Sequence, residues 1–159
     1  MAWKDSAPVL IGERINPTGK RTMQEQLRIG RFDAVIAEAI RQRSCGANML
    51  DVNVHTDGTD EQSLLADAVS AIQDACELPL AIDTANLEAM KDALKRTCGK
   101  VLLNSMTGIA QRMDDYFALL CDYGASAVVL TMDEEGVPSD AEGRLLIATA
   151  YWNAPCDSG

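Results

Sequence analysis

The strongest constraint on the fold of this 159-residue chain is a regular alternation of short apolar runs with longer segments of helical period. Runs that are apolar on both faces are typical of parallel strands covered by helices. The alternation therefore predicts right-handed strand–helix–strand units and an α/β fold with a parallel sheet. The predicted strands are Pro8–Gly12, Ala47–Asn53, Leu80–Asp83, Lys100–Asn104 and Ser126–Met132.

Amphipathic segments separate these strands. The first connection is the longest, with an irregular segment or short helix at Arg21–Gly30 before a main helix at about Phe32–Arg43. Asp60 is placed to cap the next helix at its amino end. The two helices after that are predicted to end at Gly99 and Gly124, because glycine readily terminates a helix.

The pattern breaks after Leu146. The remaining residues, IATAYWNAPCDSG, continue no clear helix and offer no sixth strand, so residues 147–159 are predicted to form an irregular tail. No linker or low-complexity stretch divides the sequence. The chain is therefore predicted to be a single domain over residues 1–159.

The charge of the chain limits its partners. A formal net charge of −10 repels phosphate backbones and anionic lipid, which argues against nucleic acid or a membrane as a main partner. No apolar run approaches the roughly 20 residues of a membrane span. The first residues, MAWKDSAPVL, lack the apolar core of a signal peptide. We therefore expect a cytoplasmic protein.

The histidine and cysteine content argues against a metal centre. His55 is the only histidine, which excludes a catalytic triad or a histidine-rich zinc site, and it is predicted to lie on a solvated loop. No two of the five cysteines form a C-x-x-C pair, so no bound metal is expected. Four cysteines fall near the ends of predicted helices and are predicted to pack into the core: Cys45, Cys76, Cys98 and Cys121.

Polar side chains stand at the carboxyl end of every predicted strand. In parallel α/β folds these ends share one rim, where ligands bind. Any single one of these residues could instead cap the helix that follows it. Asp83 and Asn104 follow directly on apolar residues, so both are predicted to line a pocket. The rim residues are Glu13, Arg14, Asn16, Asp51, Asn53, Asp83, Thr84, Asn104, Ser105 and Asp133–Glu135.

Carboxylates and amides of this kind suit a planar heterocycle with adjacent N–H donors. A carboxylate accepts two parallel hydrogen bonds from an amino group and its neighbouring ring N–H, and an amide both donates and accepts. Asp83 as the paired acceptor and Asn104 as the mixed partner match the edge of a pterin. A phosphate-binding loop is excluded for GERINPTGK, because six residues separate its glycines where the motif has four, and Arg21 replaces Ser or Thr.

Five motifs in order carry a resemblance to a known family. The chain strongly resembles the pterin-binding domain of methyltetrahydrofolate:corrinoid methyltransferases and the folate domain of cobalamin-dependent methionine synthase. It is more distantly similar to dihydropteroate synthase. The resemblance covers about residues 9–146. Its motifs are GERINPTGKR, GANMLDVN, LPLAIDTANLEAMKDAL, VLLNSMTG and YGASAVVLTMDEEGVPSDAEGR.

The resemblance implies a (β/α)₈ barrel of the TIM type, with the pterin held at the rim formed by the carboxyl ends of the strands. In that family an aspartate after strand three and an asparagine after strand four hold the pterin ring, and these match Asp83 and Asn104. Asp51 matches a position that lines the same pocket, and Asn53 matches more loosely. Asn16 corresponds to the asparagine of the family's opening motif.

The resemblance also implies a reaction. The N5-methyl of methyltetrahydrofolate would pass to cob(I)alamin, a cobalamin (corrinoid) cofactor carried by a separate corrinoid protein or domain. The pterin-binding protein would orient the ring and stabilise the charge that develops on N5. The full-length form is expected to be a homodimer.

The chain departs from the family in its number of strands. A complete barrel has eight strands in about 250 residues, and this chain supplies five. The family's strand-six aspartate and the strand-seven asparagine that acts at N5 are absent, so no catalytic residue is assigned. The ending AYWNAPCDSG resembles a truncated or frame-shifted product. We therefore expect a partial barrel with an apolar edge beside the fifth strand, and weak or no turnover.

Two other functions stay open. The first is a dihydropteroate synthase-like condensing enzyme, which is disfavoured because GERIN and MDEEG resemble the methyl-transfer branch. A pyrophosphate leaving group would also require more basic residues on the rim. The second is a non-catalytic module, either a pterin-binding remnant or a half-barrel that pairs with another chain.

Overall fold

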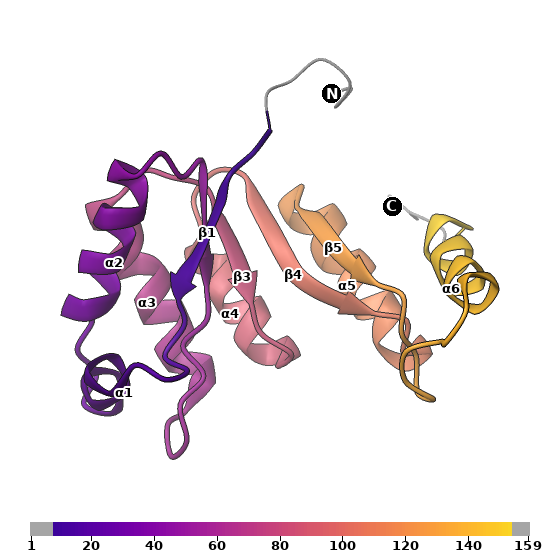
Figure 1. Ribbon diagram of the computed structural model, residues 1–159, viewed down its shortest axis with the longest axis horizontal. Coiled ribbons are helices and arrows are strands. Elements are labelled where there is room, and N and C mark those ends of the chain that lie inside the picture. Colours follow the sequence, from indigo (N-terminus) through magenta and orange to yellow (C-terminus); the bar gives the residue numbers. More distant parts are fainter. Residues whose placement is uncertain (1–7, 154–159) are drawn as a thin grey trace.

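The five predicted strands form one parallel sheet in the order β1-β2-β3-β4-β5 (Figure 1). The computed structural model describes residues 8–153, apart from the side chains of residues 110–112 and 153. Each strand pairs only with its neighbours in sequence, which is the arrangement expected from repeated right-handed crossovers. The strands are β1 (Ile11–Ile15), β2 (Met49–Val52), β3 (Leu80–Asp83), β4 (Val101–Thr107) and β5 (Ser126–Leu130).

Helices connect the strands, and Figure 1 shows α2 to α5 on one side of the curved sheet. As predicted, Asp60 caps α3, where its side chain accepts a hydrogen bond from the Gln62 amide, and Gly124 ends α5 in a left-handed conformation. No helix in residues 8–153 is long and apolar enough to cross a bilayer. The helices are α1 (Arg21–Arg28), α2 (Asp33–Ser44), α3 (Glu61–Ala75), α4 (Leu87–Arg96), α5 (Ala110–Tyr123) and α6 (Ala141–Asn153).

The core lies between the helices and one face of the sheet. Alternate residues of β2, β3 and β4 are at most 4% exposed: Leu50, Val52, Leu80, Ile82, Val101 and Leu103. Because successive strand residues point to opposite faces, the residues between these belong to the other face of the sheet. That second face carries Asp51, Asp83 and Asn104. Apolar packing on one side of the sheet therefore fixes the polar residues on the other.

The first strand lies further along the chain than predicted. β1 occupies Ile11–Ile15 rather than Pro8–Gly12, so Glu13 and Arg14 belong to the strand instead of following it. Its register with β2 shifts between Gly12 and Ile15, and there the Arg14 amide donates to Gln42 Oε1 at 3.0 Å. An edge strand tolerates polar side chains, so apolarity alone placed the strand too early.

The prediction of an irregular tail is wrong for residues 147–153, which belong to helix α6. Residues 154–159 lie outside the described part of the chain. The helix was missed because its large apolar side chains fall on several sides instead of forming one stripe. Ile147 and Tyr151 are 9% exposed and pack inward, whereas Leu146 and Trp152 are 73% and 89% exposed.

The cysteines also differ from expectation. Cys76 is buried at the end of α3, as predicted, but Cys45, Cys98 and Cys121 are exposed. Cys98 lies beyond Arg96, the last residue of α4, and so never joins that helix's apolar stripe. A small apolar residue near a helix end is therefore not enough to predict burial.

Candidate functional site

Three predicted site residues meet beside the carboxyl ends of β2 and β3. Asn104 lies within β4, which was predicted to end there but continues to Thr107. Asp83 and Asn104 are register partners on β3 and β4. Asn53 directly follows β2, and its Nδ2 donates a hydrogen bond of 3.0 Å to Asp83 Oδ2. The parallel register therefore brings these side chains together although they are far apart in sequence.

Asp51 lies on the same face of the sheet and is linked to Asn104. The Asn104 Nδ2 donates to Asp51 Oδ1 at 2.9 Å, and Asp51 is only 8% exposed. Burial raises the pKa of Asp51; the hydrogen bond from Asn104 opposes this rise, and the charges of Asp83 and Glu13 add to it. The site is thus rich in negative charge and in hydrogen-bond acceptors.

Acceptor atoms at the site remain available to a ligand. Among the described residues, side-chain hydrogen bonds reach Oδ2 of Asp83 and Nδ2 of Asn104, which leaves the Oδ1 atom of each residue without a donor. The same residues contain no group of three or more His, Cys, Asp or Glu side chains that could hold a metal ion. The arrangement fits an organic ring that presents N–H donors.

Asn16 does not join this group. Its Oδ1 accepts a hydrogen bond of 2.9 Å from the Thr18 amide and so closes the turn after β1. That contact is local and accounts for an asparagine at this position. Contact between Asn16 and a ligand stays a prediction.

A pocket of about 570 Å³ opens beside Asn53 and Asp83. Asp51, Asn104 and Asn16 are not among its lining residues. His55 lines the pocket and, as predicted, lies on an exposed loop, but its Nδ1 is 3.1 Å from Glu61 Oε2. The complete lining is Thr18, Asn53, His55, Glu61, Asp83, Thr84, Ala85 and Asn86.

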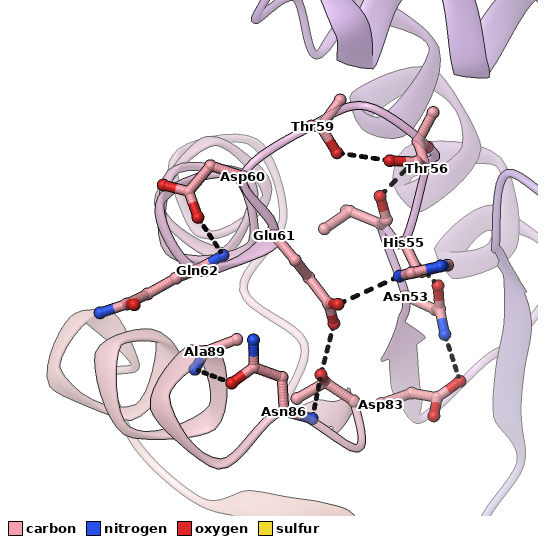
Figure 2. A network of polar contacts seen from close by, with 12 residues as sticks. Asn53, His55, Thr56, Thr59, Asp60, Glu61, Gln62, Asp83, Asn86 and Ala89 are labelled. Carbon is pink, nitrogen blue, oxygen red and sulfur yellow. Dashed lines mark hydrogen bonds and ion pairs between the residues drawn. The ribbon is translucent and has the colours of Figure 1, made fainter.

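Sequence analysis placed Thr84 on the rim but did not single out two residues that contact it in this pocket, Glu61 and Asn86. Figure 2 shows the network that they form. Glu61 accepts a hydrogen bond from the Thr84 hydroxyl, which itself accepts one of 3.0 Å from the Asn86 amide. One signal was available for Glu61, because it directly follows the predicted cap Asp60 and must therefore lie where α3 leaves the rim.

Comparison with known proteins bears on the family of this chain. The chain is 27% identical over 155 residues to a methionine synthase of Mycobacterium tuberculosis (strain ATCC 25618 / H37Rv), a match that covers 94% of this chain. The chain spans only 13% of the length of that relative. The family described as "Pterin binding enzyme" matches residues 12–147, which include all five predicted site residues. The chain therefore belongs to the pterin-binding enzyme family.

Proposed function

We propose that this chain binds the pterin ring of methyltetrahydrofolate, and that the N5-methyl passes to a corrinoid carried by a partner protein or another domain. The observation that carries the proposal is the pairing of Asp83, the last residue of β3, with Asn104 of β4, each with a free Oδ1 among the described residues. Asp83 accepts the paired N–H groups of the ring, and Asn104 is the mixed donor and acceptor. We assign the reaction to the cytoplasm.

The supporting residues have separate roles in this proposal. Asp51 orients the Asn104 amide by accepting its Nδ2 hydrogen bond, and Asn53 orients the Asp83 carboxylate by donating to it. Burial disfavours the charged form of Asp51, and the nearby charge of Asp83 adds to that cost. A ring that brings N–H donors relieves part of that cost.

In the proposed reaction the bond between the methyl carbon and N5 breaks, and its electron pair stays on N5. N5 must therefore gain a proton or a strong hydrogen bond as the bond breaks. The corrinoid, when bound, supplies the nucleophile that takes the methyl group. The residues of this chain hold the ring so that its N5-methyl presents one fixed direction to that nucleophile.

Methyl transfer is favoured over condensation by the charge of the pocket. A condensing enzyme of the dihydropteroate synthase type releases pyrophosphate, an anion that requires cationic side chains nearby. The lining of the pocket includes Glu61 and Asp83 but no lysine or arginine. The similarity to a protein named methionine synthase supports the same choice.

Binding is tested by titrating the chain with methyltetrahydrofolate in a calorimeter. Asp83→Ala and Asn104→Ala should each weaken binding by about 1–3 kcal/mol, the cost of leaving a buried polar partner unpaired. Asp67→Ala, at an exposed position of α3, is the control for loss of charge. Wild-type affinity in both folded site variants would contradict the assignment of the site.

Transfer is tested by adding cob(I)alamin to the protein and methyltetrahydrofolate and following the visible absorbance of the corrinoid. The appearance of a methylated corrinoid supports the full proposal. Binding without transfer would favour a non-catalytic pterin-binding module instead. The same preparation, measured by sedimentation, tests the expected homodimer.

A further inference from the structure

A closed ring of polar contacts joins three segments of the rim beside the pterin site (Figure 2). The Asn53 side chain donates to Asp83, and its Oδ1 accepts from the His55 amide at 2.9 Å. The His55 Nδ1 lies 3.1 Å from Glu61, and Glu61 accepts from the Thr84 hydroxyl. Thr84 is covalently bonded to Asp83, which closes the circle. We call Asn53, His55, Glu61, Thr84 and Asp83 the rim ring.

Glu61 is the bridge of the rim ring. It is the first residue of α3, and its two carboxylate oxygens reach the segment after β2 through His55 and the segment after β3 through Thr84. Its side chain is only 19% exposed. Asp83 is oriented by the side chain of Asn53 and by the backbone of Thr84. Both of these residues are in turn connected to the Glu61 carboxylate.

Thr84 shows why the bridge matters. The residue is 4% exposed, and its hydroxyl accepts from the Asn86 amide while donating to Glu61. Asn86 in turn caps α4 by accepting from the amides of Glu88 and Ala89. Removal of the Glu61 carboxylate would leave the buried Thr84 hydroxyl without its hydrogen-bond acceptor, which costs free energy. The turn after Asp83 would then rearrange until the hydroxyl finds another acceptor.

We propose that Glu61 is a positioning residue of the pterin site, which holds the turn after β3 so that Asp83 presents its carboxylate to the ligand. All five members of the rim ring line the pocket, so the ring surrounds the space that the ligand enters. The inference rests on the proposed function, because it assigns Glu61 a role in the binding of the same pterin.

The test compares three variants by calorimetry with methyltetrahydrofolate. Glu61→Ala should raise the Kd about tenfold, which corresponds to the loss of one hydrogen bond to a charged group. Glu61→Gln should stay within about threefold of wild type, because its amide oxygen still accepts from Thr84. Glu88→Ala is the matched control: it removes a 62% exposed carboxylate from the first turn of α4 and should leave the Kd unchanged.

A second measurement needs no ligand. The side-chain amide of Asn53 gives its own NMR signal, and its hydrogen bond to Asp83 slows exchange of those protons with water. In Glu61→Ala the signal should move toward that of a free asparagine and exchange faster, while Glu61→Gln and Glu88→Ala keep the wild-type signal. Thermal unfolding of each variant checks that it is folded.

Two outcomes would overturn the inference while the proposed function stands. One is wild-type affinity and an unchanged Asn53 signal in Glu61→Ala. The other is an equal loss of affinity in Glu61→Gln, which would mean that charge, and not the hydrogen bond to Thr84, matters. No binding by the wild-type chain would instead overturn the proposed function and this inference with it, whatever the variants do.

Discussion

The centre of the sheet and its β5 end differ sharply in packing. Leu50, Leu80 and Ile82 of β2 and β3 are fully buried beneath the helices. In β5 three consecutive apolar residues, Val128, Val129 and Leu130, are 38–40% exposed. Figure 1 shows α6 beyond β5, away from the group formed by α2, α3 and α4. The same alternation of strand and helix thus produces a closed core in one region and an open surface in the other.

This difference in packing indicates which part of the molecule can hold a binding site rigidly. The rim ring and the pair Asp83–Asn104 lie on β3 and β4, at the start of α3, and on the segments that directly follow β2 and β3, all of them next to the closed core. A side chain that must meet a ligand needs such support, because loosely packed elements open locally at little cost in free energy. The exposed strand β5 contributes no residue to the pocket.

The largest effect expected from this contrast is on stability. Ile82→Ala should lower the free energy of unfolding by about 2–5 kcal/mol, because it leaves a cavity in a fully packed core. Val129→Ala, at a position already 40% exposed, should cost less than about 1 kcal/mol. Urea unfolding measures both. Equal costs for the two substitutions would show that the packing contrast has no energetic counterpart.

Most of the fold follows from the sequence because burial leaves a local pattern. The strands β2 to β4 are apolar on both faces below the rim, and Leu80–Asp83 was predicted to the residue. The pattern fails where burial is one-sided or absent. Glu13 and Arg14 lie in an edge strand, and the apolar residues of α6 do not form a single stripe, so neither segment carried the expected signal.

The site, like the fold, has residues that the sequence could predict and residues that it could not. The meeting of Asp83 and Asn104 was predictable because each follows an apolar run, and a parallel sheet aligns these runs. Glu61 was not, because its partners His55 and Thr84 lie 6 and 23 residues away and are reached only through the geometry of the loops. A contact between the first residue of a helix and side chains on two loops leaves no periodic trace in the sequence.

A smaller effect is expected from the buried carboxylate of the central region. The pKa of Asp51 is raised mainly by burial, so the folded state holds the proton more tightly than the unfolded state does. Stability from this group is therefore present at low pH and is lost as the pH rises from the ordinary value of 3.8 through the raised pKa. In Asp51→Asn the side chain stays uncharged, so no stability is lost as the pH rises. The variant should therefore be more stable than wild type at neutral pH.

The measurement for this prediction is urea unfolding of wild type and Asp51→Asn at several pH values. The advantage of the variant should shrink as the pH falls and should disappear below 3.8, where the Asp51 carboxyl becomes protonated in both the folded and the unfolded state. Asp57→Asn, on the exposed loop before α3, should show no comparable gain. A variant less stable than wild type at neutral pH would contradict the assigned cause, since the amide can still accept the Asn104 hydrogen bond.

The smallest expected effects are on stability and come from two matched helix caps, one in the central region and one at the β5 end. Asp60 caps α3 by accepting from the Gln62 amide at 3.2 Å, and Asp140 accepts from the Gly143 amide at 2.8 Å where α6 begins. Asp60→Ala should lower the global free energy of unfolding by about 1 kcal/mol, since α3 unfolds only with the core. Asp140→Ala should change it by less than about 0.5 kcal/mol, because α6 frays first.

Hydrogen exchange completes this last comparison. In Asp140→Ala the amides of α6 should exchange faster while those of α3 keep their wild-type rates. In Asp60→Ala the amides of α3 and β3 should accelerate together, by the factor that corresponds to the loss of global stability. If both caps instead lowered global stability equally, α6 would unfold together with the core through Ile147 and Tyr151, and the exposed end of the molecule would be part of the same cooperative unit.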